Sequence, residues 1–288
     1  MTILYLNGQY CPLEKATISV LDRGFLFGDG VYEVIPVYQR QCYQLLPHLE
    51  RLANSLKEID CKNPYTVTQW TTIIDNVIAQ NEQDNQTIYC QVSRGIEANR
   101  LHTYQSTTKA SVMVMSQPLP TIPVQQHQQG IKAITLTDTR WQRCDIKAIS
   151  LLANCLLKQK AYNAGATEAL LIRDGKVTEG AASNVYVVLN DVIYTAPANQ
   201  FILAGITRQV LLTIAAQKKW PVKLQAIEKA QLLQAQEIWI SSSTKEILPV
   251  TVLDNKPVGE GKPGPIWRQF YQAYQQQKSI TGSVKDGR

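Results

Sequence analysis

Alternating and helical patterns of apolar residues divide the first part of the chain into strands and two helices. Residues 3–6 form a strand-like run that leads into Asn7-Gly8, a dipeptide typical of tight hairpin turns. A β-rich run at 31–38 precedes Gln39-Arg40-Gln41, which we expect to turn it into a partner strand. Pro47 suits the first position of a helix. Apolar residues then recur at helical spacing in two stretches, namely Leu49, Leu52, Leu56 and Ile59, followed by Val67, Trp70, Ile74, Val77 and Ile78.

Further strands are expected at 87–93 and 110–115, after which the periodicity stops. The stretch 117–123 holds three prolines and is followed by glutamines, a composition typical of a linker. We therefore expect a smaller N-terminal domain at 1–117, a linker at 118–129 and a larger C-terminal domain at 130–288.

The second half mixes strands, hairpins and helices. The pattern predicts a strand at 131–136 and a helix at 151–163, ended by Gly165. Hairpins turn at Asp174-Gly175 and Asn190-Asp191. Another helix begins near Ile206-Thr207 and ends before Pro221, and the last helix spans 265–277, leaving 281–288 as a frayed tail. This order predicts a two-domain α/β or α+β protein with mixed sheets.

Composition narrows the class of protein. Apolar residues make up 44% and charged residues 18%, as in folded globular proteins, and the net charge of +6 is scattered, which argues against nucleic acid as a partner. The start of the chain lacks the pattern of a signal peptide, and no apolar run is long enough to span a membrane. The cysteines show neither a disulfide framework nor zinc spacing, so we expect reduced thiols in a cytoplasmic protein; they are Cys11, Cys42, Cys61, Cys90, Cys144 and Cys155.

Two short segments have the chemistry to bind a phosphate. Gly205 precedes a predicted helix, so the N–H groups of Gly205, Ile206 and Thr207 would point outward along its axis. The run 241–244 ends a strand-like segment with hydroxyl groups, including Ser243 and Thr244, that can donate to phosphate oxygens. Taken alone, each segment is more often an ordinary helix start or polar turn.

Other segments offer a carboxylate, an amine and two cations. Glu179 is followed by small residues that would let a flat ring approach the backbone, and Lys147 precedes a predicted helix. A desolvated lysine suits Schiff-base chemistry, although most lysines are solvated. Arg100 and His102 lie in a loop, where they suit a carboxylate. The histidines His48 and His127 are predicted at the surface, and no two histidines have the spacing of metal ligands, so we expect no metal.

The order and spacing of these segments resemble the fold-type IV pyridoxal-phosphate enzymes. The runs at 179–186, 193–195 and 203–208 are similar to that family's signature, and the likeness extends from residue 6 to about residue 267. The segments 22–34, 143–147 and 100–102 are most similar to the D-amino-acid aminotransferases. The resemblance implies a small mixed α/β N-terminal domain, a larger barrel-like α/β C-terminal domain, and pyridoxal 5′-phosphate as cofactor.

The resemblance also implies a role for each matched residue. Lys147 matches the lysine that forms the internal aldimine and moves the Cα proton, and Glu179 matches the partner of the pyridine nitrogen. Leu203 matches a residue packed against the ring. The cofactor phosphate is matched by Arg51, Gly205, Ile206, Thr207, Ser243 and Thr244. The substrate carboxylate is matched by Tyr32, Arg100 and His102, of which the last two come from the neighbouring subunit in that family, implying a homodimer with shared active sites.

The implied activity is ping-pong transamination between a D-amino acid, such as D-alanine, and a 2-oxo acid, such as 2-oxoglutarate or pyruvate. An aminodeoxychorismate lyase and a branched-chain L-amino-acid aminotransferase of the same fold remain alternatives. Three details depart from expectation. Arg51 lies opposite the leucine stripe and would be predicted to be solvated, Ala182 replaces a serine common near the cofactor, and the loop from Arg94 to Arg100 is one residue longer.

Overall fold

The chain folds into two compact units. A computed structural model describes residues 2–282, with side chains described up to residue 279. The first unit comprises the chain up to Pro120 together with Ile146–Leu151, and the second comprises Thr121–Asp145 and the chain from Leu152 onward. The segment that carries Lys147, expected from the sequence in the second domain, therefore makes its contacts in the first unit. That residues 1–117 and 130–288 form two domains joined by a linker at 118–129 stays a prediction.

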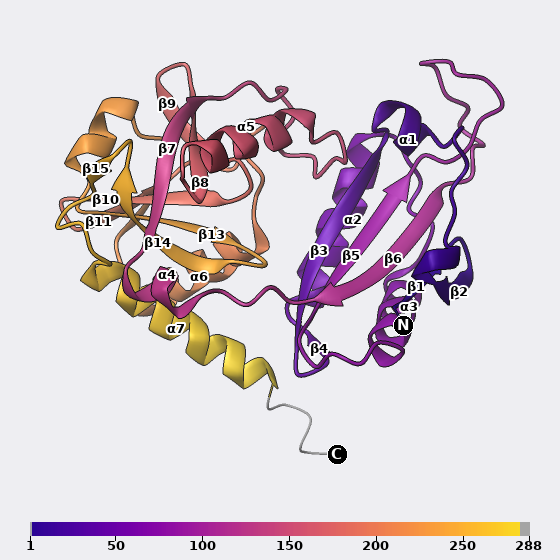
Figure 1. Ribbon diagram of the computed structural model, residues 1–288, viewed down its shortest axis with the longest axis horizontal. Coiled ribbons are helices and arrows are strands. Elements are labelled where there is room, and N and C mark those ends of the chain that lie inside the picture. Colours follow the sequence, from indigo (N-terminus) through magenta and orange to yellow (C-terminus); the bar gives the residue numbers. More distant parts are fainter. Residues whose placement is uncertain (1, 283–288) are drawn as a thin grey trace. The chain divides into compact units, whose positions relative to one another are not determined.

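The first unit is an antiparallel six-stranded sheet in the order β2-β1-β6-β5-β3-β4 (Figure 1). Its chain then returns as a short segment that bridges Ala148 to Val31 of the sheet. The strands are β1 (Ile3–Leu6), β2 (Gln9–Pro12), β3 (Gly30–Tyr38), β4 (Gln41–Cys42), β5 (Gln86–Ser93) and β6 (Ser111–Pro118), and the helices are η1 (Leu13–Lys15), α1 (Arg23–Phe27), α2 (Leu45–Glu58) and α3 (Val67–Ala79).

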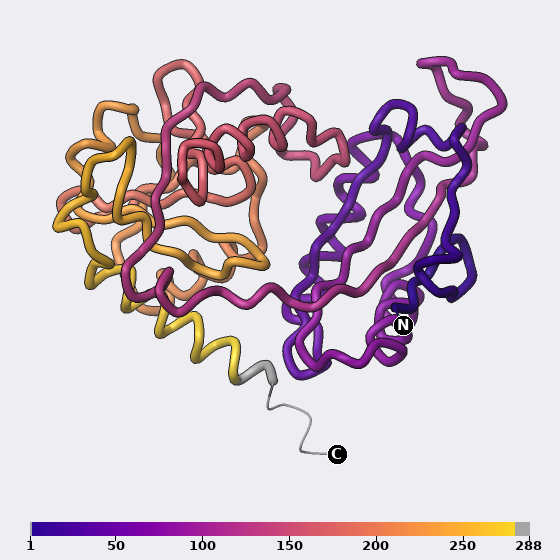
Figure 2. The backbone as a smooth tube through the Cα atoms, viewed as in Figure 1, coloured from indigo at the N-terminus to yellow at the C-terminus, as the bar shows by residue number. Residues whose placement is uncertain are grey.

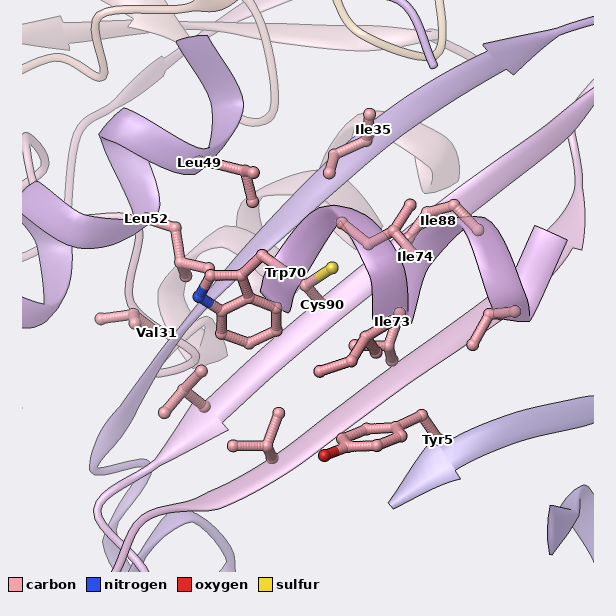
Figure 3. Close-up of a cluster of buried hydrophobic side chains, with 14 of the residues drawn as sticks. Tyr5, Val31, Ile35, Leu49, Leu52, Trp70, Ile73, Ile74, Ile88 and Cys90 are labelled. Carbon is pink, nitrogen blue, oxygen red and sulfur yellow. The ribbon is translucent and has the colours of Figure 1, made fainter. Parts of the chain in front are cut away.

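The core of the first unit lies between the sheet and helices α2 and α3. Apolar side chains from both helices interdigitate with residues of β3, β5 and β1, as Figure 3 shows. Burial alternates along β3, so that Val31, Ile35 and Val37 face the core. Glu33 lies on this same face, which places a carboxylate among apolar residues.

The second unit is built on a mixed nine-stranded sheet in the order β12-β11-β10-β13-β14-β7-β8-β9, with β15 paired to β14. The pairs β11/β12, β14/β7 and β7/β8 are parallel, and the others are antiparallel. Its elements are α4 (Val124–Gln128), β7 (Ile131–Thr137), α5 (Leu152–Asn163), β8 (Glu168–Arg173), β9 (Lys176–Gly180), β10 (Asn184–Leu189), β11 (Val192–Thr195), α6 (Ile206–Lys218), β12 (Val222–Leu224), η2 (Lys229–Gln234), β13 (Glu237–Ser242), β14 (Glu246–Leu253), β15 (Lys256–Pro257) and α7 (Pro265–Gly282).

Most elements with a clear period begin and end close to where the pattern predicts. The hairpin turns are confirmed by positive φ angles at Asn7, Asp174 and Asn190. Two predictions about helix ends are wrong: α2 begins at Leu45 and not at Pro47, and α7 continues beyond 277 to Gly282. Of the tail expected at 281–288, residues 283–288 lie outside the described part.

The long connection between β5 and β6 leaves the sheet at the end where α1 lies, and Figure 2 traces its course. Among residues 2–282, none of the helices combines the length and the apolar character that a membrane crossing requires.

Candidate active site

Lys147 lies beside β3 in the first unit. Its carbonyl accepts a hydrogen bond from the N–H of Tyr32 at 2.9 Å, and its own N–H donates to Ser55 Oγ at 3.3 Å. The Nζ atom lies 4.2 Å from the centroid of the Tyr32 ring, within the range of a cation–π contact. The backbone hydrogen bond between the two residues thus keeps the side chains of Lys147 and Tyr32 next to each other.

Arg51 and His48 both bind Glu33 in the first unit. Arg51 donates to the two carboxylate oxygens through Nε at 2.7 Å and Nη2 at 2.8 Å, and His48 Nδ1 lies 2.7 Å from Oε2. The predictions that His48 lies at the surface and that Arg51 is solvated are wrong, since their exposed fractions are 1% and 12%. The buried face of α2 is therefore wider than its leucine stripe, because it also contains His48 and Arg51, which bind Glu33.

The charges in this cluster follow from its contacts. Burial alone would raise the pKa of Glu33, but the Arg51 guanidinium and the His48 hydrogen bond hold that pKa well below its usual range. Burial lowers the pKa of His48, an effect that Glu33 partly offsets. Because the ionised carboxylate can only accept, the Nδ1 atom of a neutral His48 must carry the proton. The cluster therefore holds Arg51 in a bidentate ion pair.

Arg100 and His102 lie in the exposed connection between β5 and β6. The Arg100 guanidinium lies 4.9 Å from the centroid of the Phe27 ring, and the His102 ring centroid lies 5.5 Å from the same ring. Tyr32, predicted to act with them, lies on β3 and packs against Tyr89, with 5.5 Å between ring centroids. The structure thus brings Arg100 and His102 to one aromatic ring and Tyr32 to Lys147.

Glu179 is the last residue but one of β9 in the second unit and is almost fully buried, with 4% of its surface exposed. Its Oε2 atom accepts hydrogen bonds from Asn184 Nδ2 and from the backbone N–H of Leu203, both at 3.1 Å. Its Oε1 atom accepts from Arg140 Nη1 at 2.5 Å. Asn184 also donates to the Leu203 carbonyl at 2.8 Å, which ties the carboxylate to the segment that leads into α6.

The pKa of Glu179 is raised to about 7. Burial is the largest cause, and the neighbouring Asp138 adds to it, while Arg140 opposes both. Arg140 is not devoted to Glu179, because its Nε and Nη2 atoms donate to the two oxygens of Asp138, each at 2.9 Å. A cation placed near Glu179 would favour the charged carboxylate, so the site suits a protonated ring nitrogen.

Gly205 is the N-cap of α6, and as a glycine it has no side chain with which to cap the helix. The first intrahelical bond is the one from the Gln209 N–H to the Gly205 carbonyl at 2.9 Å, so helix geometry leaves the N–H groups of Ile206 and Thr207 for an outside acceptor. A Cβ atom at Gly205 would collide with Asn184 Oδ1. A larger residue here would therefore displace the asparagine side chain that holds Glu179.

The hydroxyl-rich run lies where β13 turns into β14. Ser241 Oγ lies 2.9 Å from the Tyr186 hydroxyl, and Ser242 Oγ accepts from the Lys245 N–H at 3.2 Å. Ser243 and Thr244, predicted to contact a phosphate, form the half-buried turn itself.

A model of the family described as amino-transferase class IV matches residues 30–253. The chain belongs to this family. Among curated members, it is 39% identical to the D-alanine aminotransferase of Bacillus licheniformis over 275 residues, which is 96% of each protein. It is 38% identical to the D-alanine aminotransferase of Staphylococcus epidermidis, over 96% of this chain and 97% of that protein.

Solved structures of other class IV aminotransferases share the fold. A branched-chain amino acid aminotransferase from T.th., solved with pyridoxamine 5′-phosphate, is 26% identical and superimposes with a TM-score of 0.87, covering 97% of this chain and 94% of the other. The branched-chain enzyme of Escherichia coli, at 24% identity, reaches a TM-score of 0.90 over 95% of this chain and 93% of its own. The fold-type IV architecture expected from the sequence is therefore confirmed.

Several polar residues of this class IV aminotransferase escaped the sequence analysis. Glu33 was recognisable in principle, because it is a charged residue at a core-facing position of an apolar strand. Asn184 stands in the signature run, but the sequence does not show that its side chain holds both Glu179 and Leu203. Arg140 lies outside every recognised motif, so its contact with Glu179 depends on the tertiary fold.

Proposed function

We propose that this protein is a pyridoxal-phosphate aminotransferase that exchanges an amino group between a D-amino acid of the D-alanine type and a 2-oxo acid. The observation that carries the proposal is the similarity to D-alanine aminotransferases over 96% of the chain, at up to 39% identity. The resemblance noted at Arg100-Leu101-His102 supports the same substrate class. The 2-oxo acid is 2-oxoglutarate or pyruvate.

The described residues fit the cofactor. A phosphate requires N–H donors, and the glycine-capped start of α6 leaves such donors unused by the helix. A buried carboxylate favours a protonated pyridine nitrogen, and Glu179 provides such a carboxylate. When bound, pyridoxal phosphate supplies an aldehyde that condenses with amines and a ring that withdraws electrons from Cα.

Lys147 is assigned the two roles that need an amine: it binds the cofactor aldehyde, and it moves the proton at the substrate Cα. Its backbone bonds to Tyr32 and Ser55 fix the start of the side chain, and the Tyr32 ring flanks its Nζ atom. A single amine held in this way delivers the proton to one face of Cα only, so stereochemistry follows from position.

Glu179 is assigned the task of keeping the ring nitrogen protonated. A buried carboxylate with a raised pKa becomes charged when it gains a cationic partner, so a bound pyridine ring would be held protonated at its nitrogen by the Glu179 carboxylate. Leu203, whose N–H also donates to Glu179, is assigned to pack against the ring. Asn184 donates to the same carboxylate oxygen as Leu203 and helps to orient it.

The remaining roles concern the two negatively charged ends of the reactants. Arg51, the N–H groups of Gly205, Ile206 and Thr207, and the hydroxyl groups of Ser243 and Thr244 are each assigned to the phosphate. Tyr32, Arg100 and His102 are assigned to the substrate α-carboxylate. We further propose a homodimer whose subunits complete each other's carboxylate site, and a cytoplasmic location, which the six unpaired cysteines support.

Absorption spectroscopy tests the proposal. Purified holoenzyme is mixed with D-alanine, L-leucine or aminodeoxychorismate, each with and without 2-oxoglutarate. We expect D-alanine alone to convert the cofactor band to its pyridoxamine form, and 2-oxoglutarate to restore it with release of pyruvate. Pyruvate from aminodeoxychorismate without 2-oxoglutarate, or turnover of L-leucine only, would replace the proposal by a lyase or a branched-chain aminotransferase.

The variant Lys147→Ala serves as the matched control. It should bind pyridoxal phosphate without the absorption band of the lysine adduct and should not exchange amino groups with D-alanine. A wild-type band that this variant retains would show that another group holds the cofactor, and would reject the role of Lys147.

A further inference from the structure

The side chain of Arg23, in the first unit, holds the backbone that carries His102. Its guanidinium donates to three consecutive carbonyl oxygens, through Nη1 to Leu101 at 2.7 Å and to Thr103 at 3.2 Å, and through Nη2 to His102 at 2.9 Å. The side chain is almost fully buried, with an exposed fraction of 4%. A buried arginine that meets three carbonyls in succession fixes the path of that backbone.

Two carboxylates neutralise Arg23 and orient its guanidinium group. Asp29 accepts from Nε at 2.8 Å, and Glu97 accepts from Nη1 at 3.2 Å. Asp29 is itself held by Arg94 Nε at 2.8 Å. Because a guanidinium presents its donors in one rigid plane, this arrangement fixes where the three carbonyls lie, which a lysine cannot reproduce.

The base of the connection is attached to the same helix, α1. The N–H of Arg23 donates to the Gly95 carbonyl at 2.8 Å, and Asp22 forms a β-bridge with Ile96. Glu97, near the start of the connection, binds two residues near its end, because its Oε1 atom accepts from the Gln105 N–H at 2.9 Å and from Thr108 Oγ1 at 2.7 Å. The start, the tip and the return of the connection are therefore all tied to α1 or to Glu97.

Phe27, on the last turn of α1, completes the arrangement. Its ring centroid lies 4.9 Å from the guanidinium carbons of both Arg23 and Arg100 and 5.5 Å from the His102 ring. Helix α1 thus sets the backbone through Arg23, and through Phe27 it offers an aromatic surface to the side chains of Arg100 and His102.

We propose that Arg23 is a positioning residue for substrate carboxylate binding, and that it acts by fixing the backbone between Arg100 and Thr103. The inference rests on the proposed function, in which Arg100 and His102 bind the α-carboxylate. Arg23 itself does not need to touch the substrate. Its loss should therefore weaken carboxylate binding while leaving proton movement at Cα intact.

Kinetics of the holoenzyme variants Arg23→Met, Arg23→Lys and Arg40→Met test the inference. Arg40 is the matched control, because it too donates to successive carbonyls, those of Ile78 at 2.7 Å and Asn81 at 3.0 Å among them, but at the end of α3. We expect Arg23→Met to raise KM for D-alanine about tenfold, the effect of losing well-placed charged hydrogen bonds, with kcat within about twofold of wild type. Arg40→Met should leave KM unchanged.

Hydrogen–deuterium exchange supplies a readout that does not depend on activity. Arg23→Met should speed exchange at 95–108 and leave 78–86 as in wild type, and Arg40→Met should show the reverse. Unchanged KM together with unchanged exchange at 95–108 would overturn the inference. So would a fall in kcat with no rise in KM, since that result indicates a general structural role.

The conservative variant keeps the inference testable if Arg23→Met fails to fold. Arg23→Lys retains the charge but cannot reach three carbonyls, so its KM for D-alanine should still rise severalfold, and a wild-type KM would overturn the inference. Failure of the proposed function has a separate signature, because wild type would then not exchange amino groups with D-alanine, while the exchange comparison would still report whether Arg23 fixes the backbone.

Discussion

Glu33 and Glu179 are both buried glutamates that meet an arginine, yet their pKa values move in opposite directions. Arg51 gives two donors to Glu33, and His48 adds a third contact. Arg140 gives one donor to Glu179 and two to Asp138, which is itself negative. Burial costs both carboxylates the same kind of free energy, so the way the arginine is shared decides which of them is charged.

The difference fits two separate tasks. Glu33 is permanently charged and keeps Arg51 in place, as a structural anion does. Glu179 is held near the balance point between its protonated and charged forms, so a cationic partner shifts it fully to the charged form. Groups poised in this way are typical of functional sites.

The largest expected effect comes from Glu179→Gln. The amide keeps the shape of the side chain but cannot carry the negative charge that stabilises a protonated ring nitrogen. We expect kcat for amino transfer to fall about a thousandfold, within the range for losing one preorganised electrostatic contact. Single-turnover kinetics with D-alanine measure it. A loss below about tenfold would mean that Glu179 is not the ring partner.

Glu33→Gln should act mainly on stability. Removing the carboxylate leaves the Arg51 guanidinium without its bidentate partner inside the first unit, a change that costs about 3–5 kcal/mol for buried pairs. Urea denaturation of the cofactor-free protein measures it, with Glu179→Gln as the comparison. An equal or larger loss in Glu179→Gln would remove the distinction between an anchoring and a poised carboxylate.

The pH dependence of stability should have opposite signs at the two sites. Folding raises the pKa of Glu179 from 4.5 to about 7, so the folded protein binds this proton more tightly and loses about 3 kcal/mol as pH rises through that window. Folding lowers the pKa of Glu33, so its contribution is present above the unfolded pKa of 4.5 and is lost as pH falls below it.

Urea titrations of the cofactor-free protein between pH 3 and 8 separate the two contributions. The difference in unfolding free energy between wild type and Glu179→Gln should fall with rising pH. The difference between wild type and Glu33→Gln should rise with pH at the acid end of the range. Two differences of the same sign would contradict the assignment of charge.

The smallest effect is expected from Asp138→Asn. The substitution removes a neighbouring negative charge and leaves Arg140 more strongly attracted to Glu179, so the pKa of Glu179 should fall from about 7 by about one unit. Infrared spectra of the carboxyl band, with Glu179→Gln as the reference, follow the titration. A pKa that stays at 7 would show that Asp138 does not contribute to it.

The sequence predicted the turns and helices whose formation depends on residues close together in the chain. Hairpin turns at Asn7, Asp174 and Asn190 follow from residues that tolerate positive φ, and the helices follow from apolar spacing. The roles assigned to Lys147 and Glu179 came from a resemblance in motif order and stay proposals.

What the sequence could not show depends on partners far apart in the chain. The burial of His48 and Arg51 depends on Glu33 in a strand, and the pKa of Glu179 depends on Arg140, which lies 39 residues away along the chain. Helical periodicity describes one face of α2 but not the polar group that the sheet presents to it. Sharing of one arginine between two acids leaves no pattern in a sequence.

The return of Ile146–Leu151 to the first unit has a consequence for folding. The main part of that unit ends at Pro120, and residues 121–145 belong to the second unit. During synthesis from the N-terminus, residues 146–151 are made after all the strands of the first unit. Their pairing with β3 is therefore a non-local contact, and contacts of this kind slow folding. The lysine on this segment therefore reaches its place beside Tyr32 only in a late step, and a truncated chain that ends before it keeps an incomplete sheet edge.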